Sequence, residues 1–338
     1  MQPISVPLYE PLAVSPEPLH ILGDQWCLEE TVQAALALDL FRLLAVPRTA
    51  AGLAHSEGWH EETAARLLRV LCHLGCLEMK DEGYQVSPLS AVYLSSDSFF
   101  YYGNNFGEPI RTGSFGADLI RCLRQEPDTV VSPEPSWTPE RLRLMGIYNL
   151  SGYIQSTVGV CDLEGASSLL DLGGGHGFYS IAFAQKYPHL TVTLYDLPPI
   201  ADAAREIVAR FGLEDRVAIR SGNFLHDHIG GGYDAVLCSN VLHKDKRAIV
   251  LPKVYEALNP GGTLILRCRI ADCPDTLANA LSKLYWQVRG GKDLFTLGQW
   301  QEFVSEFGFN RFALQDVRGI FATSTAIRPE GKGKEVPL

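Results

Sequence analysis

The sequence lacks the features of secreted and membrane-spanning proteins. No stretch of its 338 residues approaches the roughly 18 consecutive apolar residues of a transmembrane helix. The first 20 residues contain five prolines and no apolar run, so no signal peptide is evident. The eight cysteines include no C-x-x-C pair, and we interpret them as reduced thiols rather than disulfides or zinc ligands. We therefore expect a cytoplasmic protein that does not bind membranes.

An excess of positive charge is also missing. The chain has 29 lysines and arginines against 39 aspartates and glutamates, a net charge of −10. This balance argues against wholesale nucleic-acid binding, which needs a basic surface. The length is ample for two domains with a large apolar core.

The N-terminal region predicts three helices followed by a β-hairpin. Apolar spacing indicates amphipathic helices over residues 29–44 and 61–74, with a short helix at 50–54 between them. Two strands at 77–80 and 84–86 surround an Asp-Glu-Gly turn. This order is that of a winged helix. The candidate recognition helix, 61–74, has two arginines against two glutamates near its start, so we expect its apolar face to contact another subunit rather than DNA.

Residues 99–160 are aromatic and helical and form the predicted linker between the two domains. Prolines mark a loop within it, and a long helix follows from about Gly146. We expect Tyr148, Asn149 and Tyr153 on that helix to line a substrate pocket. Plain packing between domains is the alternative for each of them.

From Ser168 onward, predicted strands and helices alternate. Alternation of this kind implies an α/β fold with a mostly parallel sheet and right-handed crossovers. A closing hairpin brings the sheet to seven strands. The expected strands are 168–172, 191–195, 217–220, 235–238, 263–267, 311–316 and 319–323, and the expected helices are 177–187, 199–211, 245–258 and 297–307.

The glycine-rich turn after the first of these strands reads Asp171-Leu172-Gly173-Gly174-Gly175-His176-Gly177. Glycines at alternate positions allow close approach of a ligand and tolerate positive φ. The helix that follows should offer unpaired N–H groups to an anion. Phe178 replaces the last glycine of a G-x-G-x-x-G fingerprint, so a pyrophosphate cofactor is disfavoured. The motif resembles the first motif of class I S-adenosylmethionine (SAM)-dependent methyltransferases; a glycine-rich connection without a ligand is the alternative.

The second strand ends in Asp196, about twenty residues after the glycines. A carboxylate at that strand end binds ribose hydroxyls in folds of this type. The alternative is that Asp196 only caps the loop before Pro198. Together the two strands predict an adenosine site.

Along its whole length the chain resembles the two-domain small-molecule O-methyltransferases of the plant caffeate, hydroxyindole and bacterial natural-product types. The matching motifs lie, in order, at residues 66–71, 75–77, 84–89, 171–177, 195–198, 222–224, 241–243 and 259–262. The resemblance implies a winged-helix dimerisation domain within 1–98, the linker at 99–160 and a Rossmann-like SAM-binding domain at 161–328. The tail at 329–338 is charged and contains glycine and proline, so we expect it to be disordered. The resemblance further implies a homodimer through the N-terminal domain, with SAM converted to S-adenosylhomocysteine (SAH) and no metal.

The resemblance also assigns site residues. Asp171 and the glycines face the methionine part of SAM, Asp196 binds ribose, and Leu197 lies beside adenine. Ser239 stands where a lysine is common. The cofactor residues are thus Asp171, Gly173, Gly175, Gly177, Asp196, Leu197, Asn223, Phe224 and Ser239, and the acceptor residues are Tyr148, Asn149, Tyr153, Asn240 and Trp286.

His243 holds the position of the family's general base. A phenol or alcohol is a poor nucleophile until its proton leaves, and a histidine near its ordinary pKa can accept that proton at neutral pH. Asp293, in Gly290-Gly291-Lys292-Asp293, could orient the imidazole. The family's other acid is Cys268 here, and the loop after His243 is shorter than usual. A solvated residue at a helix start is the alternative for His243.

We therefore predict a SAM-dependent methyltransferase acting on a small-molecule acceptor, most simply on a hydroxyl oxygen. Methylation of carbon, nitrogen or sulfur, or non-methylating use of SAM, is the alternative that Cys268 leaves open. A winged-helix regulator that senses a SAM-like ligand is a third reading, but it would need a basic recognition helix.

Overall fold

The computed structural model describes residues 17–98, 101, 103, 115–124, 142, 145–146, 149–150, 152–242, 244–288 and 294–331. Within these ranges, the side chains of 17–26, 244 and 245 are not described. Three predicted site residues, Tyr148, His243 and Asp293, lie outside the described residues.

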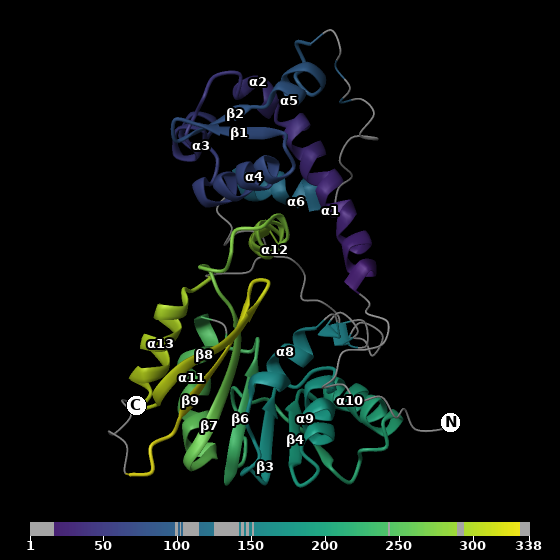
Figure 1. Cartoon of the computed structure of the whole chain (residues 1–338), viewed down its shortest axis with the longest axis vertical. Coiled ribbons are helices and arrows are strands. Elements are labelled where there is room, and N and C mark those ends of the chain that lie inside the picture. The colour runs from purple at the N-terminus through teal and green to yellow at the C-terminus, as the bar shows by residue number, and fades with distance from the viewer. Residues whose placement is uncertain are drawn as a thin grey trace. The chain divides into compact units, whose positions relative to one another are not determined.

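The described residues form two compact units (Figure 1). One contains the large sheet with its flanking helices, and the other contains the N-terminal helices and the small hairpin. The N-terminal unit also includes α12 (Leu277–Val288). This helix comes from inside the stretch that the sequence assigned to the SAM-binding domain.

Seven strands of the described chain form the large sheet, in the order β5-β4-β3-β6-β7-β9-β8. Five of them run parallel, and β9 is antiparallel to both of its neighbours, β7 and β8. The predicted mostly parallel α/β sheet is confirmed. The strands are β3 (Ser168–Leu172), β4 (Thr191–Asp196), β5 (Val217–Ser221), β6 (Tyr233–Ser239), β7 (Leu258–Arg269), β8 (Asn310–Arg318) and β9 (Phe321–Ile327).

Helices cover both faces of this sheet (Figure 1). Because successive side chains of a strand point to opposite faces, Leu169 packs on one helical layer and Leu170 on the other. Both are fully buried, as a central parallel strand requires. One layer contains α8 (Tyr153–Val160), α9 (Phe178–Lys186) and α10 (Pro198–Arg210), and the other contains α11 (Lys244–Ala257) and α13 (Leu297–Glu306).

The N-terminal unit has the predicted order of helices and hairpin, with one correction. The helix expected over 29–44 is two helices, because Asp39 adopts a left-handed φ of 51° that ends the first and begins the second. The Asp39 carboxylate accepts hydrogen bonds from Arg42 and Ser96, which hold this turn. The elements are α1 (Glu17–Ala37), α2 (Leu40–Leu43), α3 (Ala50–Glu57), α4 (Glu61–His73), β1 (Leu77–Lys80), β2 (Gly83–Val86), α5 (Pro88–Tyr93) and α6 (Phe115–Arg124).

The apolar face of α4 is covered by the chain itself, which corrects the expectation that it contacts another subunit. Leu67, Leu68 and Leu71 are buried in one cluster with Leu284 and other residues of α12. A sequence period shows that a face is apolar but not which segment covers it, and here the covering helix lies more than 200 residues further along the chain.

Two further boundaries differ from the prediction. The helix expected from Gly146 is interrupted at Gly152, whose φ of 106° precedes α8 and leaves room for the Arg318 guanidinium. Gly319, expected to begin the last strand, lies in the turn before β9. Arg328, the last residue before the expected tail, donates to the Tyr255 carbonyl and pairs with Gly262 through the backbone.

Candidate functional site

The glycine turn joins β3 to α9 at the carboxyl edge of the sheet. Gly173, Gly175 and Gly177 have φ values of 70°, 56° and 75°, so all three occupy the left-handed region predicted for them. The Gly173 N–H donates to the Tyr195 carbonyl at 2.8 Å, which ties the turn to the end of β4. Ligands of open α/β sheets bind at this edge.

Space around the turn differs from one glycine to the next. If Gly173 carried a side chain, its Cβ would lie 2.4 Å from Val241 Cγ1, so the segment after β6 packs directly on the turn. A Cβ at Gly174 would lie 2.5 Å from Leu194 Cγ. At Gly175 the nearest atom would be the Gly173 oxygen at 3.9 Å, so the turn is open there.

Asp196 binds the same turn from the neighbouring strand. Its Oδ2 accepts the Gly175 N–H at 2.9 Å, and its Oδ1 accepts the Leu197 N–H at 2.7 Å. The side chain is buried, and this burial raises the pKa of the carboxyl although the two N–H bonds oppose the shift. Each oxygen has a second lone pair that can accept a ribose hydroxyl.

Asp171 is directed into the fold, toward α9. Its carboxylate accepts the Ser180 hydroxyl at 2.7 Å and also the Ser180 N–H. Complete burial raises the pKa of Asp171 to about 7. The Phe178 N–H donates to His176 Nδ1 at 3.1 Å, so two of the first three N–H groups of α9 are already bonded. The expectation that this helix end offers free N–H groups to an anion is therefore wrong for these two.

The turn after β5 lies beside the glycine turn. The Gly222 N–H donates to the Asp196 carbonyl at 2.9 Å, and a Cβ at Gly173 would be 3.6 Å from the Phe224 ring. Asn223 Oδ1 accepts the Leu225 N–H at 3.0 Å and keeps one lone pair. Leu197 is partly exposed. These residues were predicted to surround adenine, and the fold brings them together.

A buried polar cluster lies on the other side of the turn. The Tyr179 hydroxyl donates to Asn149 Oδ1 at 3.3 Å and also bonds Thr157 and Ser239. His176 stacks on the Tyr179 ring, and its Nε2 lies 3.4 Å from the Asn149 amide nitrogen. Burial, with the charge of Arg267, lowers the pKa of His176 to about 3, so this ring is neutral.

Arg267 completes that cluster from β7. Its guanidinium lies 3.8 Å from the centre of the Phe321 ring and also faces the rings of Tyr153 and Tyr179. Arg267 pairs with Ser239 across the parallel β6–β7 ladder, and the Asn240 N–H donates to its carbonyl at 2.7 Å. Cys268 points to the opposite face, into the apolar core beneath α11 and α13.

The predicted acceptor residues divide between the two units. Asn149, Tyr153 and Asn240 belong to the unit with the glycine turn, whereas Trp286 lies on α12 in the N-terminal unit. Asn240 has a left-handed φ of 58°, and its Oδ1 accepts from Arg269.

Sequence reasoning missed several residues of this site. Gly174, His176, Tyr179 and Ser180 stand within or just after the motif that was found, but their roles depend on packing. Arg267 did carry a signal, because it is a charged residue within the apolar run of a central strand.

These groups match the chemistry of SAM in three respects. Gly175 leaves open space over the turn, and the Asp196 carboxylate can accept from a ribose. Arg267 Nη2, buried and without a hydrogen-bond partner in the described part of the chain, supplies a donor for an anionic group. The fold and this edge of the sheet define a Rossmann-like nucleoside-binding enzyme of the methyltransferase type.

Comparison with known proteins identifies the family. The O-methyltransferase domain matches residues 146–310, and the O-methyltransferase dimerisation domain matches residues 23–96. The chain belongs to this family of SAM-dependent O-methyltransferases. It is therefore a SAM-dependent methyltransferase that acts on a small-molecule acceptor, and its dimerisation domain indicates a homodimer.

Relatives of the chain methylate different atoms. It is 30% identical over 245 residues to the mitomycin biosynthesis 6-O-methyltransferase of Streptomyces lavendulae, covering 67% of this chain and 69% of that one. It is 27% identical over 342 residues to the L-tyrosine C(3)-methyltransferase of the same organism, covering 89% and 90%. An O-methyltransferase family 2 protein from Planctomyces limnophilus, in complex with apigenin, shares the fold with a TM-score of 0.69, at 20% identity over 97% of this chain and 100% of that one.

None of the helices among the described residues is both long and apolar enough to span a membrane. In the same part of the chain, no group of three or more histidine, cysteine, aspartate or glutamate side chains is arranged to hold a metal ion.

Proposed function

We propose that this methyltransferase acts on a hydroxyl oxygen of its acceptor, with His243 as the general base. The observation that carries the proposal is the contact of Val241 with Gly173. Val241 stands two residues before His243, and Gly173 belongs to the turn proposed to receive SAM. A side chain two residues further along the chain is therefore within reach of a ligand bound there.

The proposed cofactor site assigns one task to each group around the turn. Asp196 accepts the ribose hydroxyls, Leu197, Asn223 and Phe224 surround the adenine, and Gly175 lets the ligand approach the backbone. Ser239 reaches this edge through its bond to Tyr179. Asp171 lies behind the turn, where its bonds to Ser180 fix the start of α9.

Proton removal is the step that we assign to this chain's own residues. When bound, SAM supplies an electrophilic methyl group on a sulfonium that is already a good leaving group. His243 accepts the proton of the acceptor hydroxyl at a ring nitrogen, because a neutral hydroxyl is a weak nucleophile. Asp293 holds the imidazole in place. The remaining task is to keep the acceptor oxygen in line with the methyl group.

The His243→Ala variant tests this role. Turnover should fall by about 10²- to 10⁴-fold, the usual contribution of general acid–base catalysis. Affinity for SAH, measured by calorimetry, should stay the same because the imidazole faces the acceptor. His226→Ala, which removes an exposed histidine of the β5–β6 loop, is the matched control and should keep full turnover. An acceptor panel with methyl-labelled SAM supplies the substrate, and mass spectrometry locates the transferred methyl.

Methylation at carbon is the second candidate, and Cys268 favours it. This residue replaces the family's acid, is buried in the apolar core, and has its thiol pKa raised by that burial. It therefore cannot act as a carboxylate. The tyrosine C(3)-methyltransferase relative spans 89% of the chain. An acceptor that reacts at carbon does not need His243 in the same way, so near-normal turnover of His243→Ala at neutral pH would rule out the general-base role.

We also propose that the protein is cytoplasmic and forms its homodimer through the N-terminal domain without binding nucleic acid. All eight cysteines are free thiols, as is usual in a reducing compartment. Glu62 and Asp275 pair with Arg66 and Arg69 of α4, so the positive charge of the would-be recognition helix is offset by carboxylates.

A further inference from the structure

Arg267 is a buried charge in the central strand β7. Only 4% of the residue is exposed, although it stands between Leu266 and Cys268 in an apolar run. Removing a guanidinium from water is costly unless hydrogen bonds and an opposite charge replace the lost hydration. The surroundings of Arg267 should therefore contain such partners or leave a place for them.

Aromatic rings surround the Arg267 side chain. Phe321 lies 3.8 Å from it, and Tyr153 and Tyr179 lie at 5.2 Å and 5.6 Å, measured to the ring centres. Stacking of this kind suits a planar guanidinium. Ring faces, however, do not satisfy its in-plane N–H donors. Within the described part of the chain, Nη2 has no hydrogen-bond partner.

The position of Arg267 relates it to the glycine turn. It pairs with Ser239 at the carboxyl end of β6, and Cys238 pairs with Leu172 at the end of β3. Its side chain is on the same face of the sheet as α8 and α9, since Tyr153 and Tyr179 come from these helices. The helix α9 begins directly after Gly177. Arg267 thus lies beside the first turn of the helix that follows the glycines.

Other groups at this end of the site are bonded or uncharged in the described part of the chain. The N–H groups of Phe178 and Ser180 are bonded to His176 and Asp171, and the neutral His176 ring brings no positive charge. SAM and SAH each carry one anionic group, the carboxylate of their amino-acid part. A carboxylate matches the planar donor edge of a guanidinium and compensates its charge.

We propose that Arg267 binds the carboxylate of the amino-acid part of SAM and SAH through its Nη2. This inference rests on the cofactor site proposed above. It assigns carboxylate recognition to β7 rather than to the N-terminus of α9, and it gives the buried charge of Arg267 a counterion when the site is filled.

Calorimetry with SAH and decarboxylated SAH, which keeps the amine, tests the proposal. The wild-type protein should prefer SAH by about 10- to 100-fold, the scale of a hydrogen bond to a charged group. Arg267→Met should lose that preference and bind the decarboxylated ligand as the wild type does. Arg267→Lys, which keeps the charge, should retain part of it. Arg318→Met is the matched control, since Arg318 also lies over Tyr153, and it should keep the preference.

Thermal unfolding gives a second readout. Replacing an arginine with a purely structural role would lower the melting temperature of the ligand-free protein, whereas the present proposal expects no such loss. Arg267 forms no ion pair in the described part of the chain, so removing its buried charge should leave the melting temperature of the ligand-free Arg267→Met protein unchanged or raise it. The rise in melting temperature on adding SAH should shrink, following the lost affinity.

Three results would overturn the assignment. They are equal binding of both ligands by the wild type, a preserved SAH preference in Arg267→Met, or an equal loss in Arg318→Met. A separate outcome would assign the guanidinium to the acceptor. In it, Arg267→Met keeps the preference for SAH, but its SAH-loaded form no longer prefers para-hydroxybenzoate over the corresponding amide as the wild type does. The cofactor assignment would then be wrong. If Asp196→Ala binds SAH and decarboxylated SAH as the wild type does, the proposed cofactor site itself is wrong. This test does not depend on the role of Arg267.

Discussion

At the scale of single residues, Asp196 connects two parts of the site. Its two oxygens bond the Gly175 and Leu197 N–H groups, so it orders the glycine turn while facing the open space at Gly175. We expect Asp196→Ala to weaken SAH binding by about 1.5–3 kcal/mol, because hydrogen bonds to a charged group are lost. Calorimetry measures this. Unchanged affinity would remove Asp196 from the site.

Asp171 provides a prediction about pH. Burial raises its pKa to about 7, so the folded state favours the protonated acid. In the unfolded chain the acid ionises near its ordinary pKa of about 4. The free energy of unfolding therefore falls as pH rises from about 4 to 7, by at most about 1.4 kcal/mol for each unit, and the loss is complete above that window.

Asp171→Asn should remove this loss, since asparagine cannot ionise and still accepts from Ser180. Relative to wild type, the variant should gain stability between pH 4 and pH 7 in urea titrations. Asp234→Asn is the control of opposite sign. The bonds from Ser167, Asn259 and Ser168 lower the pKa of Asp234 to about 2, so its carboxylate stabilises the fold at neutral pH and the variant should lose stability there. Parallel pH curves for Asp171→Asn and wild type would contradict the prediction.

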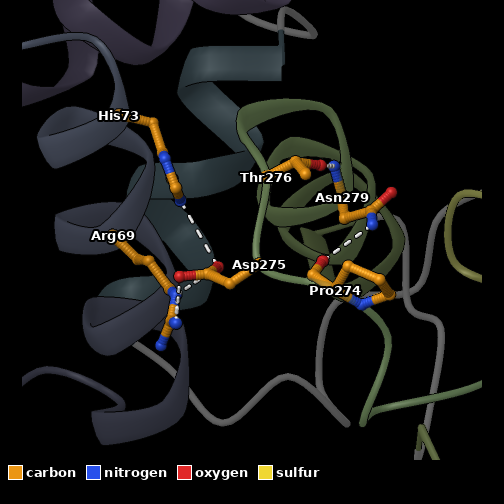
Figure 2. Close-up of polar contacts among 6 residues, drawn as sticks. All are labelled: Arg69, His73, Pro274, Asp275, Thr276 and Asn279. Atoms are coloured by element: carbon orange, nitrogen blue, oxygen red, sulfur yellow. Dashed lines mark hydrogen bonds and ion pairs between the residues drawn. The ribbon is translucent and has the colours of Figure 1, made fainter.

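At the scale of elements, the contacts between α12 and α4 show which interactions hold together segments that are distant in the sequence. Figure 2 shows the Asp275 carboxylate between Arg69 and His73 of α4, just before α12 begins. Thr276 Oγ1 accepts the Asn279 N–H at 3.2 Å and caps the helix. Asp275 and Arg69 are each about half exposed, at 47% and 53% of the side chain, so solvent screens their pairing. The apolar face of α12 is buried beneath them.

We therefore expect packing to outweigh the ion pair. Leu284→Ala should lower the free energy of unfolding of the N-terminal unit by about 2–5 kcal/mol, because Leu284 is fully buried. Asp275→Asn should cost less than about 1 kcal/mol. Hydrogen exchange of α4 and α12 distinguishes the two effects. A larger loss of protection in Asp275→Asn than in Leu284→Ala would show that the ion pair dominates.

At the scale of the whole molecule, several large apolar side chains of the N-terminal unit are exposed. Met79 of β1 and Leu89 of α5 are exposed by 57% and 58%, and both lie in the region that matches the dimerisation domain. Such side chains favour a contact that removes them from water. Light scattering should therefore give twice the mass of the 37.2 kDa chain.

Leu89→Asp should shift this equilibrium toward monomer, because a charge in an apolar interface is poorly solvated. Leu314→Asp, at an exposed position of β8, is the control and should leave the dimer intact. A wild-type monomer at micromolar concentration would contradict the homodimer. A dimer that persists in Leu89→Asp would place the interface elsewhere.

The sequence by itself determined the α/β class, the strands and the glycine turn. These follow from local rules: buried parallel strands are short apolar runs, and left-handed φ values at alternate positions require glycine. Gly173, Gly175 and Gly177 have the predicted conformation, and Asp196 reaches their turn because the carboxyl ends of neighbouring parallel strands coincide.

Tertiary structure alone decided which partners these groups have. It directed Asp171 toward Ser180, covered the apolar face of α4 with α12, and enclosed Arg267 between Phe321, Tyr153 and Tyr179. In each case the partners are far apart in the chain or on opposite sides of a turn. Hydropathy period and residue spacing record which face of an element is buried, but not which distant segment lies against it.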